Sequence, residues 1–296
     1  MRVERANAKI NLYLNVVGRR ENGYHDIVSV MQTVSLCDLV TVDFAPAEHT
    51  SICLQSSGNV EMPTDCRNLA WRAAEKFLQA TGRRGEVRII LEKHIPMAAG
   101  LAGGSADAAA VLRALNALCC NPLTVDELCT LGASLGADVP FCIRGGSALV
   151  GGIGERMEDF PAMPQCFLVV ACRGEGVSTP WAYGELDQKY SGFVEPAAAD
   201  SEPEQIRTCW ERGALLDSCT HFFNLFEEVV PAVQKDVDAL KAILQSASAV
   251  RAMMSGSGPS VFGVFACRED AESACLALRG SDAAAFVCHP CGKYPL

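Results

Sequence analysis

The chain has 296 residues, of which 49% are hydrophobic and 20% are charged, and its formal net charge is −10. An acidic chain of this composition predicts a globular protein and argues against a nucleic-acid partner, because surfaces that bind nucleic acid are basic. No run of apolar residues approaches the length of a membrane helix, and Met1–Leu12 lacks the apolar centre of a signal peptide, so we expect no membrane partner and a cytoplasmic location.

Strand and helix signals alternate in the first half of the chain, which indicates mixed α and β structure rather than a repeat. Two segments rich in β-branched and long apolar residues, Val3–Val17 and Ile27–Phe44, predict strands. Apolar residues at helical spacing predict a helix over Asn68–Ala80. The remaining elements expected in this half are a strand over 87–92, a helix over 125–135, and turns with a short strand over 145–154.

A proline-containing break, MEDFPAMP over Met157–Pro164, separates the two halves. We therefore expect two domains, residues 1–160 and residues 161–296. The acidic, aperiodic segment Tyr190–Glu204 predicts a surface loop without a functional role. The elements expected in the second half are strands over 166–171, 250–254, 261–266 and 285–288, and helices over 205–216, 231–246 and 269–279.

Most of the 15 cysteines stand in apolar contexts, such as Phe141-Cys142 and Ala266-Cys267, which is typical of reduced cysteine that packs as a small hydrophobic residue. The sequence CHPC over Cys288–Cys291 has the inner spacing of half a zinc site. Because no second Cys or His pair of matching spacing follows, we predict free thiols and no metal site, with structural zinc as the minor alternative.

The most informative stretch is PMAAGLAGGSADAAAVLRALNAL over Pro96–Leu118. Its glycines, Gly100, Gly103 and Gly104, can adopt backbone angles closed to other residues, so that several N–H groups converge on one point. Ser105 is predicted to be the N-cap of the helix that follows, whose positive dipole end would face the same point. The stretch therefore predicts a polyphosphate site, and close packing of a helix against a sheet is the alternative.

Other motifs narrow the kind of nucleotide site. The chain contains neither GxxxxGK[ST] nor a GxGxxG after a strand, which excludes a P-loop and gives no indication of a dinucleotide-binding fold. A second loop, MMSGSGPSVFGVF over Met253–Phe265, places Gly256 and Gly258 in a turn that leads into a strand. By itself this second loop also fits a plain hairpin.

Together with AKINLYLNVVGRRENGYHDI over Ala8–Ile27 and GADVPFCIRGGSALVGGIGE over Gly136–Glu155, the two loops resemble the GHMP small-molecule kinase superfamily over nearly the whole chain. The resemblance implies an α+β protein with an N-terminal domain like domain 2 of ribosomal protein S5 and a ferredoxin-like C-terminal domain. It also implies ATP as the phosphoryl donor, with Mg²⁺ carried mainly with ATP. The combination of AKINL and GYHDI resembles the members that phosphorylate the 2-hydroxyl of a cytidine diphosphate-linked methylerythritol in non-mevalonate isoprenoid biosynthesis.

The resemblance implies a catalytic pair, Lys9 in AKINL and Asp138 in GADVPF. On sequence alone, Lys9 would be a surface lysine and Asp138 would cap a turn before Pro140. In the superfamily the lysine orients the acceptor hydroxyl and stabilises charge on the transferring phosphoryl group, and the aspartate is the catalytic base. A structural salt bridge would bring the same two residues together, so the sequence leaves that alternative open.

Substrate contacts implied by the resemblance come from Asn11, Tyr24, His25 and Tyr183. The asparagine suits sugar hydroxyls, the two tyrosines can sandwich a cytosine, and the histidine can bond the base edge. Tyr24 and His25 could instead simply end a strand at a turn. The ATP contacts implied by the resemblance are Asn68, Leu69, Pro96, Met97, Ala98, Ala99, Gly100, Leu101, Ala102, Gly103, Gly104, Ser105 and Ala106. Asn68 could equally be a helix cap.

Three positions depart from the pattern of the superfamily. Ala102 stands where a glycine is typical, so we expect ordinary backbone angles there. Ala106 stands where a serine is typical, which leaves Ser105 as the one hydroxyl at the helix start for phosphate or Mg²⁺. Leu225 stands where aspartate is common, and we assign it no role.

The sequence therefore predicts an ATP-dependent small-molecule kinase. The alternative enzyme is a GHMP kinase that acts on homoserine or mevalonate, and a cytosine stack at Tyr24 would discriminate, since those acceptors carry no base. A catalytically silent protein of the same fold that only binds a ligand is the second alternative, against which the presence of both Lys9 and Asp138 argues. The sequence leaves the oligomeric state open.

Overall fold

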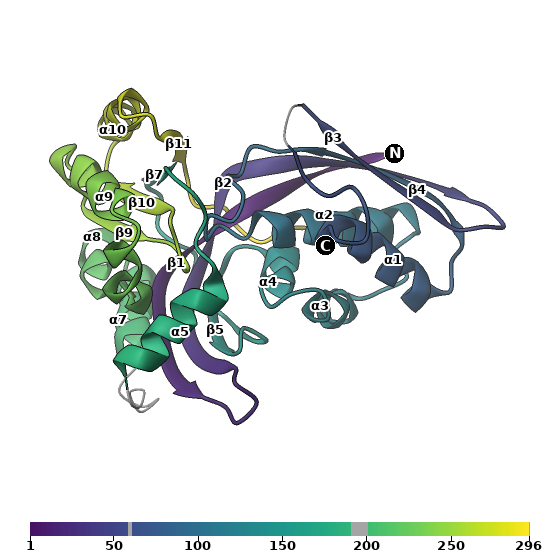
Figure 1. Cartoon of the computed structure of the whole chain (residues 1–296), viewed down its shortest axis with the longest axis horizontal. Helices are drawn as coiled ribbons and strands as arrows, with labels where there is room; N and C mark the ends of the chain where they lie inside the picture. Colours follow the sequence, from purple (N-terminus) through teal and green to yellow (C-terminus); the bar gives the residue numbers. More distant parts are fainter. Residues whose placement is uncertain (59–60, 191–200, 296) are drawn as a thin grey trace.

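The computed structural model describes residues 1–58, 61–190 and 201–295. Two β-sheets organise the chain (Figure 1). The larger sheet has the order β3 (Ser51–Ser57), β4 (Gly85–Glu92), β2 (His25–Pro46), β1 (Arg2–Arg19) and β8 (Phe223–Asn224), with β5 (Ser147–Gly152) paired to β2 and β6 (Arg156–Asp159) paired to β5. The smaller sheet has the order β11 (Ala284–Cys288), β7 (Phe167–Cys172), β10 (Val261–Phe265) and β9 (Arg251–Met254), and all its pairs are antiparallel.

The long antiparallel pair β1–β2 is the spine of the larger sheet and confirms both strands expected near the N-terminus. Its register shifts between Asn7 and Lys9 and again between Asn11 and Tyr13. Such β-bulges kink a strand locally and re-aim its side chains. Both shifts flank the segment that carries Lys9 and Asn11, so the irregular part of β1 is the part on which the sequence places functional side chains.

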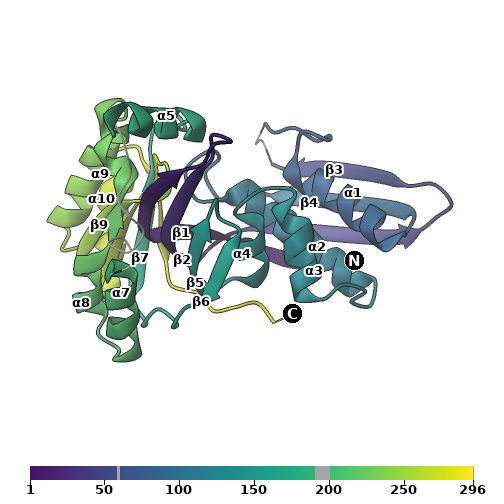
Figure 2. The same ribbon diagram turned by 90° about the horizontal axis from the view of Figure 1, so that it is seen from below.

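Four helices lie on one face of the larger sheet, as Figures 1 and 2 both show. They are α1 (Leu69–Thr81), α2 (Gly103–Leu118), α3 (Val125–Ala133) and α4 (Val139–Arg144). The Asn68 side chain accepts a hydrogen bond from Ala70 N and caps α1, and Gly82 ends this helix in a left-handed conformation. Every residue of α2 from Ala106 to Asn116 is buried, so α2 is the central helix of this layer.

The smaller sheet is covered on one face by α9 (Asp236–Ser246) and α10 (Arg268–Gly280). Its other face packs on the β1–β2 pair through a shared core that includes Ile10 and Val30 of the larger sheet and Leu168 and Phe262 of the smaller one. The chain passes between the sheets after Asp159, where β6 ends, and β8 later returns to the larger sheet. The division into domains 1–160 and 161–296 stays a prediction.

The second half differs from expectation at several helix ends. The helix expected over 205–216 is two pieces, α7 (Ser201–Glu211) and α8 (Leu215–Ser218), because Gly213 takes a left-handed φ of 71° between them. Helix α9 begins at Asp236 rather than at residue 231, since residues 230–232 form a 3₁₀ turn. Of the loop expected over 190–204, residues 201–204 are helical, and 191–200 lie outside the described residues. Helix α5 (Thr179–Lys189) was not expected at all.

All 15 cysteines are free thiols. Burial raises the pKa of many of them, to about 12 for Cys166 and Cys288, as expected for cysteine used as a packing residue. Across the described ranges, no three His, Cys, Asp or Glu side chains gather as a metal site would need. Within the same ranges, no helix has the length and hydropathy to cross a membrane.

Candidate active site

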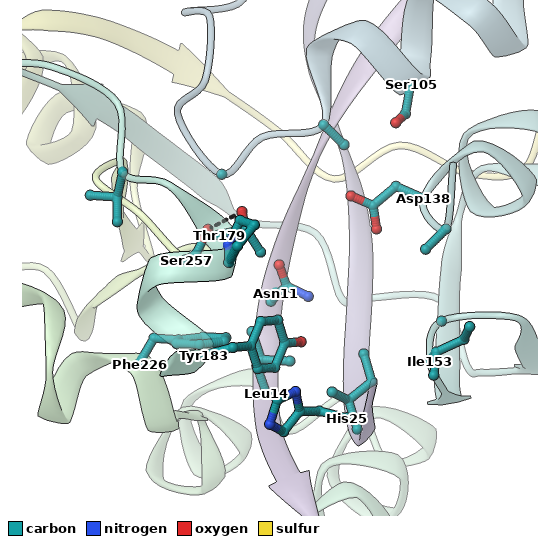
Figure 3. Close-up of a pocket in the computed structure, with 18 of the residues that line it drawn as sticks. Asn11, Leu14, His25, Ser105, Asp138, Ile153, Thr179, Tyr183, Phe226 and Ser257 are labelled. Carbon is teal, nitrogen blue, oxygen red and sulfur yellow. Dashed lines mark hydrogen bonds between the residues drawn. The ribbon is translucent and has the colours of Figure 1, made fainter. Parts of the chain in front are cut away.

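A cavity of about 820 Å³ lies where the two sheets meet. Figure 3 shows side chains of β1, β2 and α5 and of the loop between β9 and β10 converging on it. The residues proposed from the sequence that line it are Lys9, Asn11, Tyr24, His25, Leu69, Ala98, Ala99, Gly100, Ala102, Gly103, Gly104, Ser105, Asp138 and Tyr183. Those that do not are Asn68, Pro96, Met97, Leu101 and Ala106. The fold thus brings six separated stretches of the sequence to one space.

Lys9 and Asp138 face each other across this cavity. Lys9 Nζ lies 3.7 Å from Asp138 Oδ2 and donates a hydrogen bond to Asn11 Oδ1 at 2.7 Å. The Lys9 residue is only 5% exposed, so the default expectation of a surface lysine is wrong. Asn11 Nδ2 in turn donates to Ser29 Oγ, which fixes the orientation of the amide. The arrangement holds an ammonium group rigidly at the floor of the cavity.

Asp138 is the residue directly before α4, and its side chain makes no capping hydrogen bond to that helix. The expectation that it caps a turn is therefore wrong, and the carboxylate is left to face the cavity (Figure 3). Its side chain is 32% exposed, so solvent and small ligands reach it. Cys142, in the same short helix, is fully buried, and burial together with the Asp138 charge raises the pKa of its thiol.

The glycine-rich stretch, residues 98–105, forms a loop whose left-handed positions agree with expectation at Gly100 but not elsewhere. Ala98, Gly100 and Ala102 have φ values of 51°, 76° and 58°, whereas Gly103 and Gly104 are ordinary helical residues of α2. The expectation of ordinary angles at Ala102 is therefore wrong. A left-handed conformation costs a non-glycine residue about 1–2 kcal/mol, so the rest of the loop must hold both alanines in place.

Helix α2 begins at Gly103, and Ala102 occupies the N-cap position without a side-chain hydrogen bond. Ser105 is thus inside the first turn, and its assignment as the N-cap is wrong. The first N–H groups of α2 have no capping side chain and point, with the positive end of the helix dipole, at the cavity. This is the backbone arrangement that binds phosphate at helix N-termini.

The second glycine loop, residues 255–260, joins β9 to β10 as a hairpin and also packs on the first loop. A Cβ on Gly100 would lie 2.3 Å from Ser255 O, so only glycine fits this contact. Ser255 Oγ donates to Gly100 O at 3.2 Å and accepts from Asn11 N at 3.3 Å. The second loop therefore ties the glycine-rich loop to β1, and it brings Gly256 and Ser257 to the cavity wall.

The other end of the cavity is aromatic. The His25 and Tyr183 rings stack with centroids 4.5 Å apart, and Tyr183 meets Phe226 edge to face at 4.9 Å. Burial, and secondarily the charge of Asp138, raises the pKa of Tyr183 to about 12, so its hydroxyl stays protonated. Tyr24 is 60% exposed at the rim. The structure thus pairs Tyr183 with His25, and the sandwich of a base between Tyr24 and Tyr183 stays a prediction.

Three polar residues of the cavity were missed from the sequence. They are Asp187, Thr179 and Ser257. Asp187 Oδ1 lies 2.7 Å from His25 Nε2, and Thr179 Oγ1 lies 2.9 Å from Ser257 Oγ. Both Asp187 and Thr179 belong to α5, the helix that sequence reasoning did not find. The glycines of the second loop were the available signal for Ser257, but a hairpin explained them equally well.

Behind the glycine-rich loop, residues 98–105, three charged side chains form a buried cluster. They are Asp38 of β2, Lys93 after β4, and Asp107 of α2. Lys93 Nζ contacts Asp38 Oδ2 and lies 2.5 Å from Asp107 Oδ2. Asp38 Oδ1 accepts from the N–H groups of His94 and Ile95, which lead into the loop. Burial raises the pKa of Asp107 to about 7, and no donor among the described residues reaches its Oδ1. A proton on Asp107 makes the cluster electrically neutral.

Comparison with known proteins agrees with this architecture. Residues 68–146 match the model of the GHMP kinases N terminal domain, and residues 201–282 match that of the GHMP kinases C terminal domain. A crystal structure of a homoserine kinase from Cytophaga hutchinsonii, 19% identical, covers 96% of this chain and 95% of its own with a TM-score of 0.71, which shows a common fold. The chain has the two domains and the fold of a GHMP kinase.

More similar relatives define the family. A 4-diphosphocytidyl-2-C-methyl-D-erythritol kinase from Gloeobacter violaceus is 41% identical over 96% of this chain and 92% of its own length, and one from Bacillus pumilus is 39% identical over 94% and 93%. A crystal structure of a 4-(cytidine 5'-diphospho)-2C-methyl-D-erythritol kinase, 32% identical, covers 98% of this chain and 100% of its own with a TM-score of 0.80. This chain belongs to the family of 4-diphosphocytidyl-2-C-methyl-D-erythritol kinases.

Proposed function

We propose that this protein transfers the γ-phosphoryl group of ATP to the 2-hydroxyl of 4-diphosphocytidyl-2-C-methyl-D-erythritol, a step of non-mevalonate isoprenoid biosynthesis. The observation that carries the proposal is that three parts line one cavity. They are the glycine-rich loop (residues 98–105), the Lys9–Asp138 pair, and the aromatic end formed by His25 and Tyr183. An acceptor with a hydroxyl at one end and a nucleobase at the other fits that order of parts. Homoserine and mevalonate carry no base and would leave the aromatic end unused.

In the proposed reaction, ATP phosphates lie on the N–H groups at the start of α2. The acceptor oxygen forms a bond to the γ-phosphorus, the bond from that phosphorus to the ADP oxygen breaks, and Asp138 receives the hydroxyl proton. Lys9 stabilises negative charge on the transferring group. A carboxylate is a weak base, but in a loose transition state the proton leaves late, so positioning contributes most of the catalysis.

At the aromatic end, Tyr183 and Tyr24 offer ring faces to a cytosine, and the His25–Asp187 pair offers polar groups to its edge. Asn11 is held by Lys9 and Ser29 and lies between the aromatic end and the catalytic pair, where it can contact a sugar hydroxyl. These assignments rest on position in the cavity and on side-chain chemistry.

ATP fits the residues present, because an open loop of N–H groups and a helix N-terminus adjoin a large cavity. Mg²⁺ bound to the ATP phosphates would neutralise charge on the transferring group, and the oxygen ligands it prefers are offered by Ser105 and Asp138, both of which line the cavity. We propose that the ion is carried mainly by ATP.

The test of the catalytic pair is Asp138→Asn with Asp43→Asn as the matched control, since Asp43 is an exposed aspartate of β2. We expect Asp138→Asn to lower kcat by at least about a hundredfold while ATP affinity and the unfolding midpoint stay near those of the wild type. Asp43→Asn should leave kcat, ATP affinity and the unfolding midpoint unchanged. Unchanged turnover in Asp138→Asn would remove the catalytic role and leave the salt bridge as a structural contact.

A further inference from the structure

The C-terminal tail, residues 289–295, leaves the smaller sheet at β11 and crosses to the larger one. Both views show it running past α4 toward the helices that cover that sheet (Figures 1 and 2). Its backbone is bonded along the way: Cys291 N donates to Thr33 O at 2.8 Å, and Tyr294 N donates to Arg144 O at 2.9 Å. The tail is therefore held in place by hydrogen bonds as it passes from one sheet to the other, and we call residues 289–295 the strap.

Two glycines between α4 and β5 make room for this strap. Gly145 and Gly146 have φ values of 68° and 81°, and a Cβ on either would lie 2.9 Å from the side chain of Tyr294 or Lys293, respectively. A bridge pairs Gly145 with Lys293. Two consecutive glycines thus leave the space in which the strap lies, directly after α4.

Tyr294 joins the strap to α2 and β1 through its side chain. Its ring lies under the guanidinium of Arg113, 3.7 Å from the ring centroid, which is a close cation–π contact. Its hydroxyl accepts from Asn7 N at 3.2 Å and lies 2.9 Å from Asn7 Oδ1 and 3.2 Å from Arg5 O. Burial raises the pKa of Tyr294, so the hydroxyl keeps the proton that it donates.

The contact with Asn7 falls at the bulge that precedes Lys9 in β1. There the register of β1 against β2 shifts, and the Tyr294 hydroxyl supplies a hydrogen-bond partner to the strand at that irregular point. Because a bulge re-aims the side chains beside it, a group that fixes the bulge also fixes the direction of the Lys9 side chain.

Arg113 extends the same network to α4. This arginine, on α2, is 3% exposed and donates to Cys142 O at 2.7 Å and to Arg5 O at 2.8 Å. Tyr294 N donates to Arg144 O, so two carbonyls in the last turns of α4 receive their donors from Arg113 and the strap. Asp138 stands at the start of this six-residue helix, so the placement of α4 sets the place of its carboxylate.

We propose that the strap is a positioning element for phosphoryl transfer: Tyr294, packed on Arg113, fixes the bulge of β1 and the last turn of α4 so that Lys9 and Asp138 meet across the cavity. Tyr294 does not line the cavity, so it is a positioning residue. The inference rests on the proposed function for its kinetic consequence, and its structural part stands independently of that function.

The test compares Tyr294→Phe and Tyr294→Ala with Lys293→Ala, the neighbour whose side chain passes over Gly146 and ends in an exposed ion pair with Asp159. Because small misplacements of reacting groups lower the rate steeply, we expect kcat to fall at least about tenfold in Tyr294→Ala, with KM for ATP and for the cytidylated acceptor within about twofold of the wild type. Tyr294→Phe keeps the ring on Arg113 but loses the hydroxyl, and its kcat should fall about fivefold. Lys293→Ala should match the wild type.

Amide hydrogen exchange gives a readout that does not depend on activity. Exchange should be faster in Tyr294→Ala than in Lys293→Ala at residues 7–9 and 138–144, with the strands of the smaller sheet unchanged. An inactive wild type would refute the proposed function, and the exchange pattern would still decide on the strap. Equal kcat in both Tyr294 variants and the wild type, a proportional rise of both KM values, or unchanged exchange in the two segments would each overturn the proposal.

Discussion

Replacing Asp107 by asparagine should change how the stability of the protein depends on pH. In the folded protein, burial beside Asp38 raises the pKa of Asp107 from 3.8 to about 7, although Lys93 opposes the shift. Between these values the carboxyl is protonated when folded and ionised when unfolded, so unfolding releases a proton. The stability contribution is therefore complete below about pH 4 and is lost as the pH rises through about 7.

One released proton corresponds to about 1.4 kcal/mol of stability per pH unit, or roughly 2 kcal/mol between pH 5 and pH 7, because about half of the folded protein has lost the proton at the upper limit. Asparagine keeps the shape of the side chain and an oxygen for Lys93, and it cannot ionise. The free energy of unfolding of Asp107→Asn minus that of the wild type, measured in urea, should therefore rise by about that amount over this range. Asp43→Asn, at an exposed site, is the control.

A difference between Asp107→Asn and the wild type that stays constant from pH 5 to pH 7 would refute this reasoning. It would mean that Lys93 neutralises Asp107 fully and that the cluster holds two carboxylates. A difference that grows in the opposite direction would mean that the native state favours the ionised form.

Three further changes test the loops and the aromatic end. Ala102→Gly relieves a left-handed alanine and should raise the free energy of unfolding by up to about 1 kcal/mol, whereas Ala117→Gly, inside helix α2, should lower it by about 1 kcal/mol. Gly100→Ala drives a Cβ into Ser255 O and should cost about 2 kcal/mol or more and raise KM for ATP; a stability equal to the wild type would contradict the loop contact. Asp187→Asn should raise KM for the cytidylated acceptor about tenfold and leave KM for ATP unchanged, because the two groups that lose their carboxylate partner, His25 and Arg19, lie outside the glycine-rich loop. Equal changes in both constants would contradict that assignment.

Patterns local in sequence predicted part of the larger sheet and of its helix layer: β1, β2, β4, β5 and helices α1, α2 and α3 were expected, whereas β3, β6, β8 and helix α4 were not. Alternating β-branched residues predicted β1 and β2, and helical spacing with Asn68 in front predicted α1. Helix α5 was not predicted because only two of its residues, Ala182 and Leu186, are buried, so its sequence shows no apolar stripe at helical spacing. The ends of α7 and α9 were misplaced because Pro203 is tolerated in a first turn and residues 230–232 form a 3₁₀ turn instead of a helix.

The parts of the candidate site that lie in one local motif could be predicted from the sequence. The pairing of Lys9 with Asp138 came from the resemblance to the superfamily. Lys9 and Asp138 are 129 positions apart, and no periodicity in the sequence connects them. The left-handed alanines, the buried Asp38–Lys93–Asp107 cluster and the strap contact at Tyr294 depend on packing between segments distant in the chain. Such features follow from the tertiary fold and have no signature in a single stretch of residues.

The central claim is that one cavity brings ATP and a cytidylated acceptor together. Its most direct test incubates the purified protein with ATP and Mg²⁺ and, in parallel, 4-diphosphocytidyl-2-C-methyl-D-erythritol, homoserine or mevalonate, and identifies the phosphorylated product by mass. We predict product from the cytidylated acceptor alone. Product from homoserine or mevalonate instead, or no product from any acceptor, would contradict the account.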